Sequence, residues 1–321
     1  RLLLILAALA TGMSVSELLV FYQDFGQQAF TKRNLFQRWK SLYENGELEK
    51  KLKQVFGAHT DLSPENLQTL LLVVTRNKTT DSAWPISSNP QAKFNDTVRL
   101  DCNLNIPLWQ IVRASTAAPV FFPPEVIRWD PKDDSKAFVF VDGGLTPYNN
   151  PAFLLYRMAT EPAYRLNWAG GEDKLLVISV GTGAAAALVE GVEDPNRGLL
   201  GNVAALPSAL MYAAMVDQDT NCRSIGRCVH GAPIDREVGD MIPRDEGGKM
   251  IPLSQDLGRR FLYARYNADL SREGLDALGL NDIKPKNVQK LDSIEYIPDL
   301  RKVGRKLAKE IKIEHFGSFI S

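Results

Sequence analysis

Short apolar runs alternate with stretches of helical periodicity along the chain. Runs rich in β-branched residues predict buried strands at residues 70–75, 137–141 and 174–180, with a possible fourth strand at 260–266. Apolar spacing and end signals predict helices between and after these strands. The predicted helices are residues 107–119, 150–160 and 202–217, a helix that starts at 271, and an amphipathic helix at 298–313.

The beginning of the chain is unusually apolar. Residues 2–10 contain only apolar side chains, but they are too few to span a bilayer. We expect a buried helix that ends at Gly12, followed by a capping box, Ser14 to Glu17, that opens a second helix. The alternative is that the run belongs to a secretory signal. Further on, the polar segment 79–96 holds two prolines and predicts a loop.

Strands that alternate with helices are typical of an α/β fold. Fully apolar strands favour a mainly parallel sheet that helices cover on both faces. We see no repeat and no linker, so we expect a single domain over residues 1–321, with a helical C-terminal part from about residue 270.

Composition narrows the function classes. The 38 Lys and Arg residues balance the 38 Asp and Glu residues, so net charge favours neither nucleic acid nor an anionic membrane as a partner. We expect apolar contact to dominate any membrane association. Three cysteines are too few for a disulfide framework and indicate a reducing, cytoplasmic compartment.

Asp142 is the first candidate catalytic residue. It follows a predicted strand directly, where ligands of open α/β sheets bind, and Gly143 and Gly144 after it leave its carboxylate accessible. Partial burial would raise the pKa of this carboxyl group toward that of a useful general base. The alternative is an aspartate that only hydrogen-bonds the backbone of its own turn.

Two other motifs suggest different chemistry. Residues 181–186 match the G-x-G-x-x-A pattern of dinucleotide-binding proteins, but no acidic residue stands at the required distance, so we favour a tight strand exit. Cys222, Cys228 and His230 resemble a zinc site without a fourth ligand, and we favour buried thiols. We therefore expect neither a cofactor nor a metal.

Three motifs in register resemble the patatin-like phospholipase family. The first is residues 113–119 (Arg-Ala-Ser-Thr-Ala-Ala-Pro) with 121–124 (Phe-Phe-Pro-Pro). The second is Val-Asp-Gly-Gly at 141–144 with Asn-Asn-Pro at 149–151, and the third is Ser-Val-Gly-Thr-Gly at 179–183. The resemblance implies a three-layer α/β/α fold and a lipid acyl hydrolase with a Ser–Asp dyad and no histidine.

The resemblance also assigns roles to residues. It implies that Asp142 is the dyad base, that Gly143 and Gly144 form its supporting turn, and that Asn149, Asn150 and Pro151 are structural. The apolar residues 121–124 either border the acyl site or form a packed turn. The implied partner is a phospholipid or another acyl lipid, met transiently at a membrane surface. An activator of unknown identity is left open, and the family includes secreted effectors as well as cytosolic enzymes.

The printed chain departs from the family pattern at its beginning. The family's G-x-S-x-G nucleophile elbow and its glycine-rich oxyanion turn have no counterpart, because Gly12-Met13-Ser14-Val15-Ser16 follows a predicted helix and ends in serine. We expect the missing strand and elbow to precede Arg1. The alternatives are an internal deletion or a catalytically inactive lipid-binding or interaction module. An NAD-binding oxidoreductase is the less favoured hypothesis.

Overall fold

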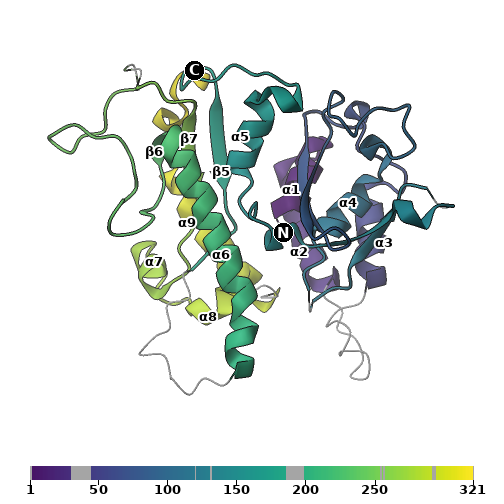
Figure 1. Cartoon of the computed structure of the whole chain (residues 1–321). Helices are drawn as coiled ribbons and strands as arrows, with labels where there is room; N and C mark the ends of the chain where they lie inside the picture. The colour runs from purple at the N-terminus through teal and green to yellow at the C-terminus, as the bar shows by residue number, and fades with distance from the viewer. Residues whose placement is uncertain are drawn as a thin grey trace. The chain divides into compact units, whose positions relative to one another are not determined.

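The chain folds into two compact units, which we describe separately (Figure 1). The computed structural model describes residues 2–29, 45–119, 121–130, 132–185, 199–253, 255, 257–290 and 294–320. Unit 1 comprises Arg1–Thr146 and Glu161–Leu166, and unit 2 comprises Pro147–Thr160 and Asn167–Ser321. The expected single domain over residues 1–321 stays a prediction.

Unit 1 contains a four-stranded antiparallel sheet with the strand order β2-β1-β4-β3. Its strands are β1 (Leu72–Asn77), β2 (Ser82–Ser87), β3 (Glu125–Arg128) and β4 (Ala137–Val141). The four residues between β1 and β2 are too few for a crossover, so these two strands pair as a hairpin. Strand β2 lies in the segment that we expected to be a loop. Pro85 in β2 is tolerated because β2 lies at the edge of the sheet, where proline is compatible with a strand.

Four helices pack in unit 1. They are α1 (Leu2–Ala10), α2 (Val15–Ala29), α3 (Asn45–Phe56) and α4 (Leu108–Ser115). Helix α4 contacts β1, β3 and β4, and α1 and α3 contact α4. Leu4, Ala7 and Ala8 of α1 are buried in this core, but Leu6 and Leu9 are exposed, so the apolar helix is buried on one side only.

The expected signals at the ends of α1 and α2 are confirmed. Gly12 has a φ of +92°, and the N–H groups of Gly12 and Met13 donate to carbonyl oxygens of the last turn of α1. Ser14 and Glu17 form the reciprocal capping box, in which the Ser14 N–H donates to Glu17 at 2.8 Å and the Glu17 N–H donates to Ser14 at 3.2 Å. Ser14 is therefore a helix cap and not a nucleophile on an elbow.

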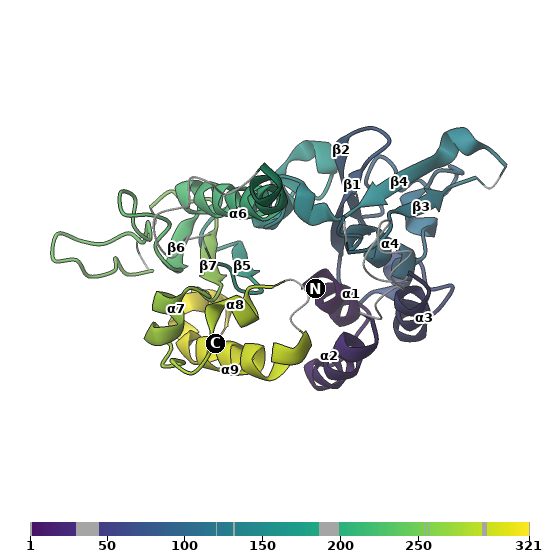
Figure 2. The ribbon, with the colours of Figure 1, turned by 90° about the horizontal axis from the view of Figure 1, so that it is seen from below.

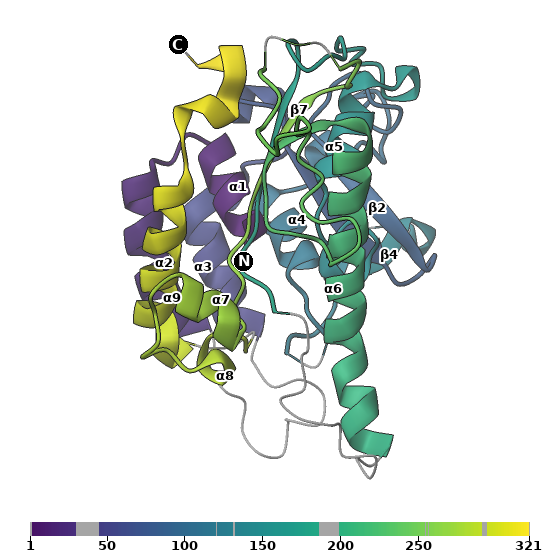
Figure 3. The same ribbon diagram turned by 90° about the vertical axis from the view of Figure 1, so that its left-hand side faces the viewer.

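Unit 2 contains a three-stranded parallel sheet with the order β5-β7-β6. The strands are β5 (Leu176–Val180), β6 (Arg227–His230) and β7 (Leu262–Tyr266). Helices α5 (Ala152–Thr160) and α6 (Leu199–Ile225) pack on one face, and the C-terminal segments cover the other (Figures 2 and 3). Unit 2 thus has helix, sheet and helix layers.

The C-terminal part is helical, as expected. Helices α7 (Arg272–Ala277), α8 (Pro285–Val288) and α9 (Ile297–Leu307) surround a small core of their own. Ser271 caps α7 by accepting a hydrogen bond from the Gly274 N–H at 3.0 Å. Among the helices in the described ranges, none is both long and apolar enough to cross a membrane.

The α/β class is thus observed, but one mainly parallel sheet is not confirmed. The parallel strands belong to unit 2, where long connections that include α6 separate them, whereas the strands of unit 1 are antiparallel. Apolar strand composition did not reveal this difference, because an antiparallel strand that is buried on both faces is equally apolar.

Candidate active site

Asp142 lies where β4 ends in unit 1. The last residue of β4, Val141, pairs with Arg76 of β1, and the next backbone N–H, that of Asp142, donates to the carbonyl oxygen of Ala117 at 3.1 Å. Ala117 lies two residues after the end of α4 and is buried. Strand β4 and the end of α4 therefore fix the backbone of Asp142 together.

The turn after Asp142 holds its carboxylate. Residues Gly143–Leu145 form a 3-10 turn, and Oδ1 of Asp142 accepts a hydrogen bond from the Gly144 N–H at 2.7 Å. Gly143 lies so close to β1 that a Cβ would overlap the carbonyl oxygen of Val74. The hydroxyl of Ser115 donates to the same carbonyl oxygen at 2.6 Å. Gly143 thus permits a close approach to β1, and Gly144 supplies a backbone donor.

The surroundings of Asp142 disfavour its charged form. The residue is partly exposed, but protein packs densely around its carboxyl group, and this burial raises its pKa. A smaller effect, the hydrogen bond from the Gly144 N–H, lowers the pKa.

This arrangement suits a carboxylate general base. A raised pKa brings the proton affinity of Asp142 closer to that of a group that accepts and returns a proton near neutral pH. None of the hydrogen bonds described for Asp142 involves a histidine. Asp142 also accepts the hydrogen bond from the backbone of its own turn that the alternative interpretation predicted. The geometry is therefore compatible with a general base and with a turn-stabilising aspartate.

The motif at residues 113–124 forms a packed turn. The buried Arg113 donates to the carbonyl oxygen of Pro123 at 2.7 Å, and its guanidinium lies 5.6 Å from the centroid of the Phe122 ring. Phe122 is buried, and Phe121 is partly buried against the core of unit 1. These contacts favour the packed-turn interpretation over a border of the acyl site.

Gly181 and Gly183 form a strand exit in unit 2. The Gly181 N–H donates to Tyr266, the Gly183 N–H donates to Oδ1 of Asn267 at 3.0 Å, and Ala184 bridges Asp269. The segment thus continues beside the end of β7. Ala186 and the position of the helix that dinucleotide binding requires lie outside the described residues.

Cys222, Cys228 and His230 do not form a metal site. Both thiols are free and buried, and burial raises the pKa of Cys222 to about 12 and that of Cys228 to about 11. His230 instead stacks on His315, with ring centroids 4.6 Å apart. Within the described ranges, no group of three or more His, Cys, Asp or Glu residues has a geometry for a metal ion.

Sequence reasoning missed a buried polar network in unit 2. Asn150 caps α5 through Oδ1, which also accepts from the Ser179 hydroxyl at 3.0 Å, and Arg265 donates to that hydroxyl at 2.7 Å. Ser179 and Arg265 are register partners on β5 and β7. This capping is consistent with the structural role that we expected for Asn150. Its contact with Ser179, and the contact of Ser179 with Arg265, depend on the register of β5 and β7 and were therefore not predictable from the sequence.

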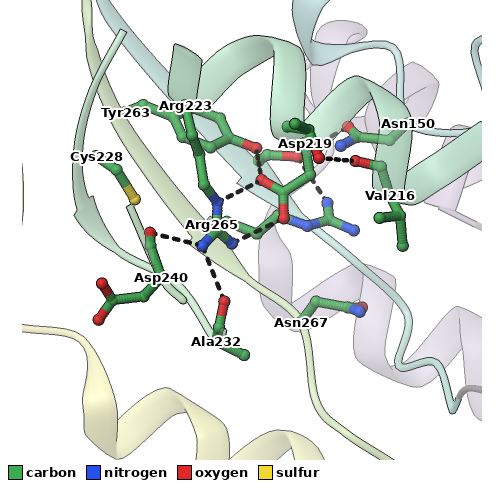
Figure 4. Close-up of polar contacts among 12 residues, drawn as sticks. Asn150, Val216, Asp219, Arg223, Cys228, Ala232, Asp240, Tyr263, Arg265 and Asn267 are labelled. Carbon is green, nitrogen blue, oxygen red and sulfur yellow. Dashed lines mark hydrogen bonds and ion pairs between the residues drawn. The ribbon is translucent and has the colours of Figure 1, made fainter. Parts of the chain in front are cut away.

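A second part of this network lies on α6 (Figure 4). Asp219 accepts hydrogen bonds from Arg223 at 2.7 and 3.0 Å and from the Tyr263 hydroxyl at 2.8 Å. Arg223 also donates to the carbonyl oxygens of Ala232 and Asp240. These groups satisfy one another and tie the segment after β6 to α6, which indicates a structural role.

Comparison with known proteins agrees with the motifs. A model of the patatin-like phospholipase family matches residues 4–156. A Caenorhabditis elegans protein named intracellular phospholipase A2 is 27% identical over 242 residues, which cover 73% of this chain and 19% of that protein. The chain thus spans about a fifth of that relative's length. Asp142 and its supporting turn lie within the region that the patatin-like phospholipase model matches.

Proposed function

We propose that this chain is the aspartate-bearing part of a lipid acyl hydrolase of the phospholipase A type, with a serine nucleophile outside the printed residues. The position of Asp142 carries the proposal. Its carboxyl group follows β4 directly, accepts a hydrogen bond from the Gly144 N–H at 2.7 Å and has a pKa that burial raises. The resemblance to patatin-like proteins implies that their nucleophile precedes the helix that corresponds to α1, so the serine would meet Asp142 there.

The proposed reaction has two steps. In the first, the serine hydroxyl transfers its proton to Asp142 while Oγ attacks the ester carbonyl carbon. The bond to the glycerol oxygen breaks, and the proton on Asp142 passes to that oxygen, which leaves as an alcohol. In the second step, Asp142 takes a proton from water, the hydroxide attacks the acyl-enzyme, and the serine departs with the proton.

The environment of Asp142 supports this assignment. A fully solvated aspartate is a weak base at neutral pH, and the burial that raises its pKa strengthens it. Hydrogen bonds from the Gly144 N–H to Asp142 Oδ1 and from the Asp142 N–H to the Ala117 carbonyl oxygen hold the turn in position. A base held in this way loses little free energy in reorientation as the proton moves.

The test is the release of fatty acid by the complete gene product. We expect it to hydrolyse a phosphatidylcholine dispersion and a soluble short-chain ester. The Asp142→Asn variant should lose roughly 100-fold or more of both activities, because removal of a general base typically costs this much. Its far-UV circular dichroism should match that of the wild type, and its melting temperature should be no lower.

Asp134→Asn is the matched control, because the side chain of Asp134 is 95% exposed and lies 3.9 Å from its ion-pair partner Arg128. This control should keep full activity. Full turnover by Asp142→Asn would remove Asp142 from the mechanism. A complete product that binds lipid without hydrolysis would instead favour the inactive lipid-binding module, and tight NAD binding would favour the oxidoreductase.

The substrate class and compartment are part of the proposal. The substrate is the acyl ester of a phospholipid or related lipid, met transiently at a membrane surface. The reducing compartment is supported by three free, buried cysteines, Cys102, Cys222 and Cys228. The word "intracellular" in the name of the C. elegans relative is consistent with a cytoplasmic location.

A further inference from the structure

Helix α9 has two unlike faces. Leu300, Val303 and Leu307 pack into the small C-terminal core, at the spacing of one helical stripe. The remaining surface is basic and exposed; its members are Arg301, Lys302, Arg305, Lys306 and, just after the helix, Lys309. Residues 297–313 hold six basic residues and two acidic residues, whereas the whole chain has a net charge of zero.

Most of this basic charge has no acidic partner among the residues that the structure describes. Lys302 pairs with Asp282 at 3.3 Å and with Asp299 at 3.4 Å. Within the described ranges, no ion pair neutralises the other four members of the basic face. Glu310, the other acidic residue of this segment besides Asp299, lies 3.6 Å from His230 and thus faces β6.

Exposed apolar side chains follow the basic residues along the chain. Ile311 is 48% exposed and Ile313 is 71% exposed, and they flank the exposed Lys312. Phe319 and Ile320 are also exposed near the end of the chain. Exposed isoleucines beside a concentrated basic face are unusual on a surface that only meets water, and they suit a boundary between charged headgroups and acyl chains.

We propose that α9 and residues 308–313 form a docking surface for anionic phospholipid bilayers. The basic side chains would contact the phosphate and carboxylate groups of the lipids, while Ile311 and Ile313 would enter the acyl boundary. Clusters of four to eight basic residues on an amphipathic helix are typical of such binding. This inference goes beyond the proposed function. It rests on that function in one respect, because a lipid hydrolase needs access to a membrane.

A bilayer explains both parts of the surface. Phosphates of a nucleic acid would satisfy the basic side chains, but they offer no partner for the exposed isoleucines. Single-stranded nucleic acid also favours aromatic side chains on which bases stack, and residues 301–313 contain none. Charge and apolar exposure together therefore favour the lipid surface.

The experiment measures cosedimentation of the complete gene product with vesicles of non-hydrolysable diether lipids. One set contains 70% phosphatidylcholine and 30% phosphatidylserine, and the other contains phosphatidylcholine alone. We expect clearly tighter binding to the anionic vesicles and weaker binding as salt rises. Each basic residue near an anionic surface contributes roughly fivefold. The triple variant R301E/R305E/K309E should thus bind at least about 100-fold more weakly.

The matched control reverses three exposed lysines of unit 1, Lys78→Glu, Lys93→Glu and Lys132→Glu, and changes net charge equally. It should keep most of the anionic binding. The variant I311S/I313S should bind both vesicle types more weakly, because it removes apolar insertion. These outcomes would support the surface.

Three results would overturn the proposal. The first is equal binding to both vesicle types, and the second is an equal loss of vesicle binding in the triple variant and its control. The third is a triple variant that binds vesicles like the wild type but has lost binding to single-stranded RNA. Hydrolysis of the soluble ester separates this proposal from the enzymatic one. Charge reversal on α9 should leave that hydrolysis unchanged. A product with no hydrolysis but charge-dependent vesicle binding would contradict only the proposed function.

Discussion

Gly143 lies against the carbonyl oxygen of Val74 so closely that a Cβ at this position would overlap it. The obstacle is backbone, which cannot rotate away as a long side chain can. The Ser115 hydroxyl, which donates to the same carbonyl oxygen at 2.6 Å, further restricts the movement of β1. The turn that holds Asp142 is therefore coupled to the position of a neighbouring strand.

Gly143→Ala should destabilise the protein and displace Asp142. Overpacking of this kind typically costs about 1–3 kcal/mol of unfolding free energy, and urea denaturation would measure it. Gly46→Ala in α3 is the control, because a Cβ at Gly46 meets nothing within 4 Å. The control should be neutral or slightly stabilising, since alanine favours a helix more than glycine does. Equal stability of the two variants would contradict the close approach at Gly143.

The raised pKa of Asp142 predicts a pH dependence of stability. Burial favours the protonated carboxyl group in the folded state, so the native protein binds more protons than the unfolded chain. Stability from this residue is therefore present at acid pH and is lost as pH rises from the ordinary aspartate range through the raised pKa. Asp142→Asn should remove this trend, and chemical denaturation from about pH 4 to pH 8 would measure it.

Asp134→Asn again serves as the control for pH, because it removes an exposed carboxylate. The free energy of unfolding of this control should follow that of the wild type across the pH range. In the complete protein, the rate of hydrolysis should also fall as the pH is lowered, because the base must be ionised. The midpoint of this fall should lie above the ordinary pKa range of aspartate. Parallel stability profiles for wild type and Asp142→Asn would show that burial does not perturb this group.

Strong local signals made much of the fold predictable. The run at residues 137–141 forms β4 with the expected bounds, and the other three apolar runs overlap β1, β5 and β7. Strands β2, β3 and β6 were missed. Strand β2 contains a proline, and β3 and β6 are four residues each, too short for a clear alternation of apolar and polar positions.

The residues of the candidate site were likewise predictable only in part. Asp142 was recognisable because a carboxylate followed by two glycines at a strand end is a local pattern. The Ser179–Arg265 contact was not, because it depends on the pairing of strands 86 residues apart in the chain. Zinc chemistry was suggested by spacing alone, whereas in the described residues His230 stacks on His315 and no three potential ligands come together.

Unit 2 should be sensitive to the loss of either partner of its buried ion pair between Arg227 and Glu172. Both side chains are nearly inaccessible, their atoms are 3.0 Å apart, and Arg227 also donates to the carbonyl oxygens of Pro252 and Gln255. Arg227→Met should cost about 3–5 kcal/mol of unfolding free energy, because it leaves a buried carboxylate without its partner. Urea unfolding followed by circular dichroism would measure this loss.

A double variant separates the charge effect from the packing effect. Arg227→Met with Glu172→Gln removes both charges and should recover part of the lost stability. Arg128→Met is the surface control, because its ion pair with Asp134 spans 3.9 Å between exposed side chains. It should change the free energy of unfolding by less than about 1 kcal/mol. A double variant no more stable than Arg227→Met would show that lost packing, not the unpaired charge, causes the damage.

The stacked pair of His230 and His315 should make the end of the chain sensitive to acid. The Tyr266 hydroxyl lies 2.8 Å from Nδ1 of His315, which fastens residues Ile313–Phe319 against β7. Burial lowers the pKa of both histidines, and Arg223 and Lys312 lower that of His230 further. The neutral rings therefore fit the folded state, and their contribution is lost as pH falls through the ordinary histidine range, about 6.5.

Hydrogen exchange at residues 313–319 would measure this effect. We expect faster exchange at pH 5.5 than at pH 7.5, after correction for the intrinsic pH dependence of exchange. His315→Phe keeps an aromatic ring but cannot be protonated, so most of the acid sensitivity should disappear. His59→Gln removes an exposed histidine and should leave the response unchanged. If both variants kept the full response, acid would loosen this segment through a group other than the stacked pair.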